Sequence, residues 1–388
     1  MSALKAELVA LIRDEGPLTI SRYMALCLGH PRHGYYMTRD PFGADGDFTT
    51  APEISQMFGE LIGLWAANVW RAMGSPGNVR LVELGPGRGT LMADMLRAAK
   101  VLPGFREALS VHLVETSPVL RAAQGQVLAG KVLFGRAGPL WHDRIETALD
   151  GPVIVVANEF LDALPLDQFV MTADGWRERL VGLDEQGELA FGLAGEAAGV
   201  EPRPARAPIP DPSRQQAGER EPVVPIGSVL EHPQAALDVV SSIAGHLGRQ
   251  DGAALFIDYG STRSGFGDTL QAMRKHAFIG PLAEPGEADL TVHVDFAKMA
   301  QAGLRAGAAC HGPATQRDFL LALGLAERAE ALRSRATPEQ AASIAAAAAR
   351  LTDPSATGMG HLFKVLALSH PGLPPLPGFD LHRLPEQG

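Results

Sequence analysis

Residues 79–91 read Val-Arg-Leu-Val-Glu-Leu-Gly-Pro-Gly-Arg-Gly-Thr-Leu. The apolar run over 79–84 predicts a strand, which is followed by a glycine-rich turn and a helix that begins at Thr90. Such a turn forms a nucleotide cradle, because bare backbone lets a ligand approach and the free N–H groups of the helix start point at it. A dinucleotide fingerprint, G-x-G-x-x-G, needs glycine at position 90, where this chain has threonine. The stretch therefore predicts a cradle for another class of nucleotide.

The spacing of Glu83, Gly85, Gly87 and Gly89 resembles the first motif of class I S-adenosylmethionine (SAM) methyltransferases. In that family the glycine turn meets the methionine part of the cofactor, which contains no pyrophosphate. The resemblance implies that SAM is the cofactor and that these four residues bind it. Pro86 departs from many members of the family, because proline removes one N–H donor from the turn.

Strand and helix patterns alternate from residue 79 onward, which predicts a parallel sheet covered by helices on both faces. The expected strands are 79–84, 110–115, 139–142, 152–157, 253–259, 307–311 and 361–368. The predicted fold class is α/β: a Rossmann-like sheet of the class I SAM-methyltransferase type, with seven mostly parallel strands, a helical N-terminal extension and two insertions.

The chain has 388 residues, which suits a core domain with large insertions. The sequence pattern divides the chain into four parts. They are a helical N-terminal region with a lid loop (1–78), a SAM-binding core (79–165, 223–313 and 351–370), a β-ribbon with a flexible loop (166–222), and a helical insertion (314–350).

Composition excludes several classes of function. The formal net charge is −10 and there is no long run of Lys or Arg, so a nucleic-acid partner is not expected. No apolar run reaches the ~18 residues of a membrane helix, and the N-terminus lacks the apolar core of a signal peptide, so we expect a cytoplasmic protein without membrane insertion. The two cysteines and the scattered histidines show no disulfide framework or metal-ligand spacing. The oligomeric state is not predicted.

Residues after the next two strands extend the cofactor site, because such sheets bind ligands at the carboxyl ends of their strands. Glu115 is placed to accept both ribose hydroxyls of an adenosine; alternatively, it caps the following helix or is solvated. Where methyltransferases usually contact adenine, Asp143 is a candidate acceptor for the amino group and Trp141 for packing on the ring. The alternative there is a core tryptophan beside a helix-capping aspartate.

Thr50 is a further candidate for cofactor binding. It belongs to the stretch Gly-Asp-Phe-Thr-Thr-Ala-Pro-Glu at 46–53, which precedes a helix expected from Pro52 to about Met73. The stretch suits a lid over the cofactor. It also suits a capping box in which Thr50 caps the helix and Glu53 completes the box, and this interpretation is favoured although the two are compatible.

The strand at 152–157 delivers Asn158, Glu159 and Asp162 at its carboxyl edge, beside the place where a methyl group would sit. These are the candidate catalytic residues, and Asn158 is also a candidate for cofactor binding. Buried carboxylates are costly unless paired, so two of them imply a cationic partner, and the planar fork of a guanidinium fits best. The alternatives are an ion pair with an arginine of this chain or capping of the N–H groups of a short helix.

A wider set of motifs resembles the MidA-like family. The motifs are Gly-Asp-Phe-x-Thr-Ala-Pro-Glu (46–53), Glu-Leu-Gly-Pro-Gly-Arg-Gly-Thr (83–90), Glu-Thr-Ser-Pro (115–118), Trp-His-Asp (141–143), Ala-Asn-Glu-Phe-Leu-Asp-Ala-Leu-Pro (157–165), Ile-Asp-Tyr-Gly (257–260), Gly-Asp-Thr-Leu-Gln (267–271) and His-Val-Asp-Phe (293–296). The family includes a mitochondrial assembly factor of respiratory complex I that methylates an arginine. The resemblance implies a SAM-dependent protein arginine methyltransferase, with a protein substrate and a complex I subunit as the expected target.

Two other functions remain open at this point. One is a non-catalytic assembly chaperone with a methyltransferase fold, and the other is a small-molecule N- or O-methyltransferase. The intact glycine turn together with Glu115 favours an enzyme over a chaperone. The helical N-terminal region and the two insertions suggest a broad docking surface, which favours a protein substrate over a small molecule.

Overall fold

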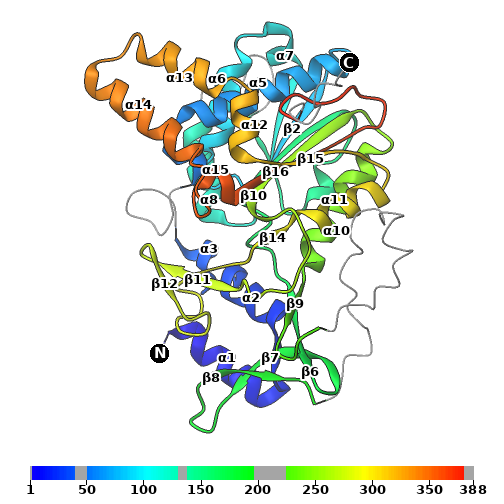
Figure 1. Cartoon of the computed structure of the whole chain (residues 1–388), viewed down its shortest axis with the longest axis vertical. Coiled ribbons are helices and arrows are strands. Elements are labelled where there is room, and N and C mark those ends of the chain that lie inside the picture. Colours follow the sequence, from blue (N-terminus) through cyan, green and yellow to red (C-terminus); the bar gives the residue numbers. More distant parts are fainter. Residues whose placement is uncertain (1, 40–49, 130–137, 196–223, 380–388) are drawn as a thin grey trace.

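The computed structural model describes residues 2–39, 50–129, 138–195 and 224–379. Figure 1 shows an upper part built around a large sheet and a lower part built from the N-terminal helices and two smaller sheets. The helices α13 and α14 project from the upper part at the upper left of this view.

The large sheet confirms the predicted fold class. Its strands lie in the order β15-β16-β10-β5-β2-β3-β4, with β14 paired to β10 beside them. Their bounds are β2 Val79–Leu84, β3 Leu109–Val114, β4 Leu140–His142, β5 Val153–Asn158, β10 Gly252–Ser261, β14 Val294–Asp295, β15 Ala309–Thr315 and β16 Phe363–Ser369. β16 runs antiparallel to both of its neighbours, and the other pairs in the sheet are parallel.

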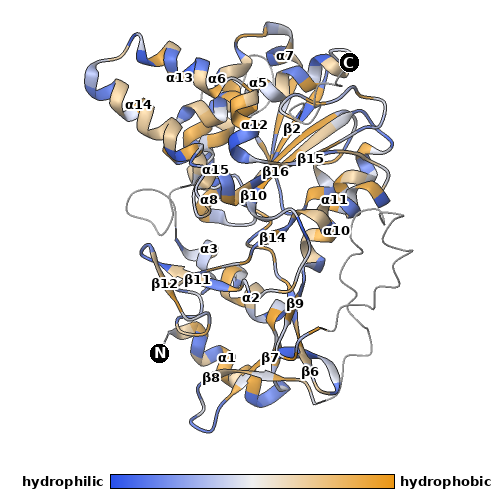
Figure 2. Ribbon diagram, in the orientation of Figure 1, coloured by the Kyte–Doolittle hydropathy of each residue, from blue (hydrophilic) through white to orange (hydrophobic). Residues whose placement is uncertain are grey.

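Both faces of this sheet are buried, which explains why its strands are almost continuously apolar (Figure 2). Along β5, Ile154 and Val156 pack in one hydrophobic cluster while Val153, Val155 and Ala157 pack in the other. The helices that cover or flank the sheet are α5 Gln56–Ala72, α6 Thr90–Ala99, α7 Pro103–Ala108, α8 Pro118–Leu128, the 3-10 turn η1 Ile145–Thr147, α10 Gln234–Leu247, α11 Phe296–Arg305, α12 Gln316–Ala322, α13 Leu325–Arg333, α14 Pro338–Leu351 and α15 Met359–Leu362.

The helix expected from Pro52 to Met73 is divided into two. α4 (Ala51–Ile54) is followed by Ser55, whose backbone is extended, and the Ser55 hydroxyl accepts the amide N–H of Met57 at 3.2 Å to start α5. In the second insertion the sequence predicts one helix over 315–332, but Gly324 with φ 91° separates α12 from α13.

The sequence predicts a helix that Asp295 caps and that ends before Gly303; the cap is confirmed and the end is wrong. The Asp295 side chain accepts the amide N–H of Lys298 at 3.0 Å, and the helix continues to Arg305. Gly303 has another role, because a Cβ at this position would lie 2.6 Å from Leu368 Cδ2. The glycine therefore allows α11 to approach β16 closely.

The lower part joins segments that are far apart in the chain. Its elements are α1 Ala3–Glu15, β1 Leu18–Thr19, α2 Ile20–Gly29, α3 Tyr35–Thr38, β6 Asp167–Thr172, β7 Gly175–Leu183, β8 Leu189–Leu193, β9 Val229–His232, β11 Gln271–Arg274, β12 Ala277–Ile279 and β13 Asp289–Thr291. The β-ribbon predicted within 166–222 corresponds to β6, β7 and β8, and β1 and β9 extend its sheet. One hydrophobic cluster joins α1 and α2 to strands of both small sheets.

The N-terminal residues 1–78 thus divide between two packing units. α1 and α2 belong to the cluster of the lower part, whereas α5 packs in the cluster of the central sheet. The four-part division of the chain remains an interpretation. Across the described ranges, no helix combines the length and apolar character that crossing a membrane requires.

At Gly260 the fold leaves no room for a side chain. It pairs with Val294 where β10 meets β14, and a Cβ there would lie 2.0 Å from the Val294 carbonyl oxygen. We expect Gly260→Ala to lower the free energy of unfolding by roughly 1–3 kcal/mol, because backbone atoms must move. The measurement is chemical denaturation. Gly245→Ala on α10 is the control, since a Cβ there would make only an ordinary contact, 3.7 Å from Arg249 Nη1. Equal stability of the two variants would contradict the explanation.

Candidate active site

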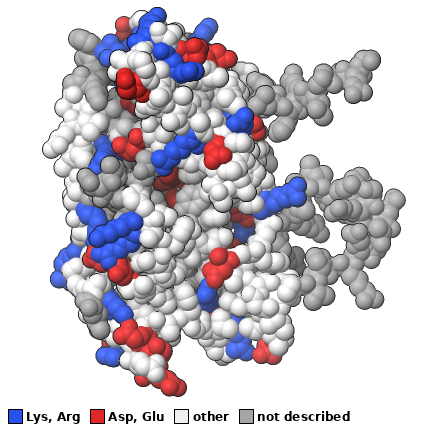
Figure 3. Space-filling model, turned by 60° about the vertical axis from the view of Figure 1, so that its left-hand side comes forward, with Lys and Arg blue, Asp and Glu red and all other residues white. Residues whose placement is uncertain are grey.

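A cavity of about 440 Å³ opens at the carboxyl edge of the central sheet and extends to the helices of the lower part. It brings together Thr50, Gly85, Gly87, Glu115, Asp143, Glu159 and Asp162 of the predicted site residues. The wall also includes Tyr36 of α3, Phe160 and Asp289, which were not among those candidates. Tyr259 lines it too; its place at the end of a predicted strand suits a wall of the acceptor pocket or core packing equally. Figure 3 shows basic and acidic side chains interspersed on one face of the molecule, with acidic atoms inside a hollow near its middle.

The glycine turn has the geometry that its sequence predicts. Gly85, Gly87 and Gly89 have φ values of 58°, 52° and 85°, a region that favours glycine, and α6 begins at Thr90 directly after them. A Cβ on Gly85 would lie 2.7 Å from Cδ2 of Phe160. The first glycine is therefore required both by its backbone conformation and by the ring packed over it.

Glu115 lines the cavity and accepts a hydrogen bond just before α8, whose N-cap is Ser117 rather than Glu115, and its role at the ribose stays a prediction. Its Oε1 accepts the amide N–H of Ser117 at 2.8 Å, and its Oε2 accepts the side-chain amide of Gln124 at 3.2 Å. Burial raises the pKa of Glu115, and these hydrogen bonds oppose that rise. Asp143 lies at the exposed rim of the same cavity, where it pairs with Arg121 at 2.5 Å.

Trp141 is not among the described residues that line the cavity, and its packing on the adenine stays a prediction. Its indole N–H donates to Oε1 of Gln124 at 2.8 Å. Gln124 in turn donates to the carbonyl of Gly87 at 2.8 Å and to Glu115. Trp141 therefore orients a glutamine that ties the glycine turn to Glu115, a link that no local sequence pattern indicated.

Glu159 stands directly after β5 in a strained backbone conformation, with φ 50°. Its Oε1 accepts the amide N–H of Ala51 at 3.0 Å and the side-chain amide of Asn158 at 3.0 Å. The first of these bonds is the helix-capping alternative considered above, here at the start of α4. Burial is the main cause that raises the pKa of Glu159 to about 7, and the nearby Asp162 raises it further.

Asp162 is held by a network that sequence reasoning missed. Asp258, at the end of β10, accepts the amide N–H groups of Phe160, Leu161 and Asp162 at 3.0–3.2 Å, which fixes the turn after β5. The Tyr259 hydroxyl is hydrogen-bonded to the Asp162 carboxylate, and burial raises the pKa of Asp162 to about 6. The only signal in the sequence was the Asp-Tyr-Gly at the strand end.

Thr50 lines the cavity but does not form the expected capping box. It precedes α4 without a side-chain cap hydrogen bond. Glu53 instead accepts the hydroxyl of Thr90 at 2.7 Å, which ties α4 to the start of α6. Residues 46–49 of the predicted lid lie outside the described residues.

Comparison with known proteins identifies the family. Residues 61–314 match the model of a family described as "Putative S-adenosyl-L-methionine-dependent methyltransferase". The chain belongs to this family. A crystal structure from Burkholderia thailandensis, described as bound to S-adenosyl-homocysteine, has 32% sequence identity and a TM-score of 0.78, with 97% of this chain and 94% of that chain covered. The predicted cofactor, SAM, is confirmed by the family and by this relative.

Curated relatives are named as arginine methyltransferases. "Protein arginine methyltransferase NDUFAF7 homolog, mitochondrial" of Drosophila melanogaster is 37% identical, with 94% of this chain and 84% of the relative covered. The human "Protein arginine methyltransferase NDUFAF7, mitochondrial" is 36% identical, with 83% of this chain and 73% of the relative covered. Both names place the relatives in mitochondria, which contradicts the cytoplasmic location predicted from the sequence.

The methyltransferase site has two buried acceptor atoms that suit the cofactor. Oε2 of Glu83 and Oδ1 of Asn158 have no hydrogen-bond partner among the described residues, and both side chains line a cavity beside the glycine turn. Burial raises the pKa of Glu83 well above its usual range. Unpartnered buried acceptors are costly, and a cationic group such as the α-ammonium of SAM would satisfy them. The residues present therefore fit the cofactor.

The glycine turn generates a direct test of cofactor binding. We expect Gly85→Val to weaken SAM binding by about a hundredfold or more, because the side chain would displace Phe160 and strain the turn. Isothermal titration calorimetry measures the effect. Gly192→Ala on β8 is the control, since nothing lies within 4 Å of its Cβ position. Wild-type affinity in Gly85→Val would contradict the placement of the cofactor over this turn.

Proposed function

We propose that this protein is a SAM-dependent protein arginine methyltransferase that transfers a methyl group to a guanidinium nitrogen. The names of the relatives, which align over most of the chain, support the arginine acceptor. The MidA-like resemblance extends the proposal to a subunit of respiratory complex I as the target.

One observation carries the proposal: the cofactor turn and the candidate acceptor acids line the same cavity. Gly85, Gly87 and Glu115 provide the cofactor part, and Glu159 and Asp162 provide the acids. Among the described residues of that wall, none is a lysine or an arginine. The buried acids therefore lack a cation within the wall itself, and an arginine from a substrate supplies it.

Bound SAM supplies a methyl group that its sulfonium already activates for in-line displacement by the acceptor nitrogen. The chain contributes mainly positioning. Glu159 and Asp162 accept hydrogen bonds from the guanidinium N–H groups, which fixes the plane of the acceptor and directs one nitrogen toward the methyl group. The bonds from Ala51 and Asn158 hold Glu159, while Asp258 holds the turn beneath it.

The same carboxylates also stabilise the positive charge of the acceptor during the reaction. A guanidinium that enters the cavity lowers their pKa values again, because an opposite charge favours the ionised form. They then stabilise the cation in a site with little water. The acceptor nitrogen becomes more acidic as it is alkylated, so a strong general base is not required and Glu159 is placed to receive the proton.

The first test of the proposed function uses cells. Deletion of the gene should remove a methylarginine signal from the proteome in mass spectrometry, and the wild-type gene should restore it. Glu159→Gln should fail to restore it and should lower the turnover of the purified enzyme about a hundredfold or more, because the charge that orients the guanidinium is lost.

The Glu159→Gln variant should keep SAM affinity within about twofold, since glutamine still accepts the amide N–H of Ala51. Glu146→Gln serves as the matched control, because this exposed carboxylate pairs with Arg144 and does not line the cavity. Unchanged methylarginine in the deletion strain would reject the proposed function. Unchanged turnover of Glu159→Gln would show that Glu159 has no role in the reaction, but it would leave the proposed function standing.

The elevated pKa of Glu159 predicts the pH dependence of the reaction. The free enzyme binds the guanidinium through the carboxylate form, which is lost as the pH falls through about 7. We therefore expect kcat/KM to rise with pH up to about 7 and to level off above it. The measurement is a pH–rate profile at low acceptor concentration. A limb near pH 7 that persists in Glu159→Gln would assign the ionisation to another group.

A further inference from the structure

A third carboxylate lines the same cavity from a different part of the chain. Asp289 is the first residue of β13, and only 4% of its surface is exposed. The Tyr36 hydroxyl lies 2.9 Å from both of its carboxylate oxygens and donates to them. Tyr36 also lines the cavity, so this aspartate and its tyrosine partner both face the space that holds the acceptor acids.

The strand that carries Asp289 is joined to the acceptor turn. Leu290 and Val292 pack in the hydrophobic cluster of the lower part, so Asp289 and Thr291 take the other face of β13. The amide N–H of Val292 donates to the carbonyl of Asp162 at 3.0 Å. Thr291 is hydrogen-bonded to Tyr259, which in turn bonds to the Asp162 carboxylate. β13 and the acceptor turn therefore form one continuous wall.

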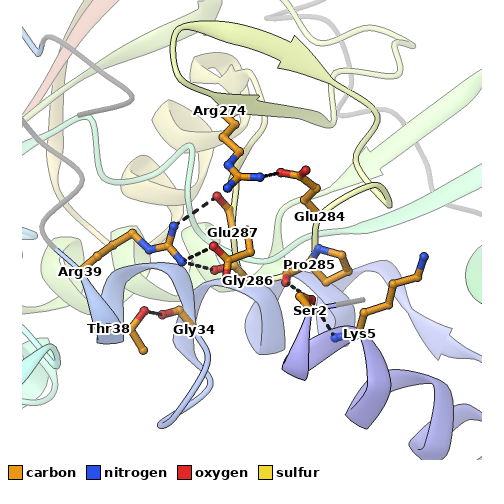
Figure 4. Close-up of polar contacts among 10 residues, drawn as sticks. All are labelled: Ser2, Lys5, Gly34, Thr38, Arg39, Arg274, Glu284, Pro285, Gly286 and Glu287. Carbon is orange, nitrogen blue, oxygen red and sulfur yellow. Dashed lines mark hydrogen bonds and ion pairs between the residues drawn. The ribbon is translucent and has the colours of Figure 1, made fainter. Parts of the chain in front are cut away.

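A second set of contacts fixes the segment just before Asp289 (Figure 4). The guanidinium of Arg39 donates to the carbonyl of Gly286 at 3.2 Å and pairs with the Glu287 carboxylate at 2.8 Å. The Ser2 hydroxyl donates to the carbonyl of Pro285 at 3.1 Å. These bonds hold the segment against α3 and the N-terminal residues. Asp289 is thus positioned by its neighbours in sequence as well as by Tyr36, the kind of support that a binding group requires.

We propose that Asp289, oriented by Tyr36, is a second anchor for the acceptor guanidinium and determines the affinity for the substrate arginine. This inference rests on the proposed arginine methyltransferase function. A guanidinium carries five N–H donors in one plane, more than Glu159 and Asp162 engage along one edge. A carboxylate contributed by β13 engages a second edge, so that the plane is fixed from two elements and one nitrogen remains directed at the methyl group.

The test separates acceptor affinity from turnover. The acceptor is a protein extract from cells that lack the enzyme, the methyl donor is labelled SAM, and the products are analysed for methylarginine. For Asp289→Asn we expect the rate in dilute extract to fall about ten- to a hundredfold, as for the loss of a charged hydrogen bond. At saturating extract the rate should return to within about threefold of wild type. SAM affinity should not change.

Two further variants make the result interpretable. Tyr36→Phe keeps the Asp289 charge and removes its orienting hydroxyl, so we expect a smaller rise in KM of about three- to tenfold. It also provides the decisive measurement should Asp289→Asn fail to fold. Glu284→Gln is the matched control, because this carboxylate belongs to the same segment but pairs with Arg274 and does not line the cavity (Figure 4). It should match wild type throughout.

The outcomes distinguish this inference from the proposed function. If wild type labels arginine and Asp289→Asn matches it at every extract dilution, the second anchor is rejected while the arginine methyltransferase stands. A loss of SAM affinity in Asp289→Asn, or a fall in kcat alone, also rejects the anchor, since a structural role accounts for both. If Asp289→Asn does not fold and Tyr36→Phe behaves as wild type, the anchor is equally rejected. If wild type labels no arginine, both proposals fail together.

Discussion

The arrangement of the acceptor site depends on one buried carboxylate, that of Asp258. Three successive amide N–H groups after β5 donate to it, and the amide of Tyr259 donates to its other oxygen at 2.9 Å. A turn with buried amides needs such an acceptor, because unsatisfied backbone donors are costly. This bond network sets the direction in which Asp162 leaves the sheet. It also places a further acid beside Asp162 and Glu159, and burial together with these two neighbours raises the pKa of Asp258 well above its usual range.

The sequence predicts the parts of this protein that follow local rules. Strands such as 79–84 are buried on both faces and are continuously apolar, and the turn after β2 needs positive φ at the positions where glycine stands. Glu159 was also accessible from sequence, because it directly follows a buried strand. The positions that escaped prediction depend on tertiary contacts. The hydrogen bond from Trp141 to Gln124 joins different elements, and the break at Ser55 follows no glycine or proline at that position.

Asp289 and Tyr36 show why the acceptor side of the site is harder to predict than the cofactor side. The cofactor turn lies within one strand–turn–helix unit, so its chemistry is contiguous in sequence. The acceptor side combines α3, the turn after β5 and β13, and Tyr36 and Asp289 are separated by 253 residues. The alternation of apolar and polar residues over 288–292 assigns Asp289 to one face of its strand, but no local pattern indicates that Tyr36 lies opposite that face. Only the shared hydrophobic cluster of the lower part brings them to one wall.

Glu159 combines two features that a stable fold would otherwise avoid. It is a non-glycine residue at φ 50°, and burial raises the pKa of its carboxyl group to about 7. Backbone strain of this kind costs about 1–3 kcal/mol and persists only where the surroundings determine it. Here the amide of Ala51 and the side chain of Asn158 hold the carboxylate, and the backbone N–H of Glu159 donates to Ile257 of the neighbouring strand at 2.8 Å. Local rules fail where a site is functional. At this position the backbone places a carboxylate in the wall of the cavity that the glycine turn shares, and in the function proposed above a bound guanidinium would offset the cost of its burial.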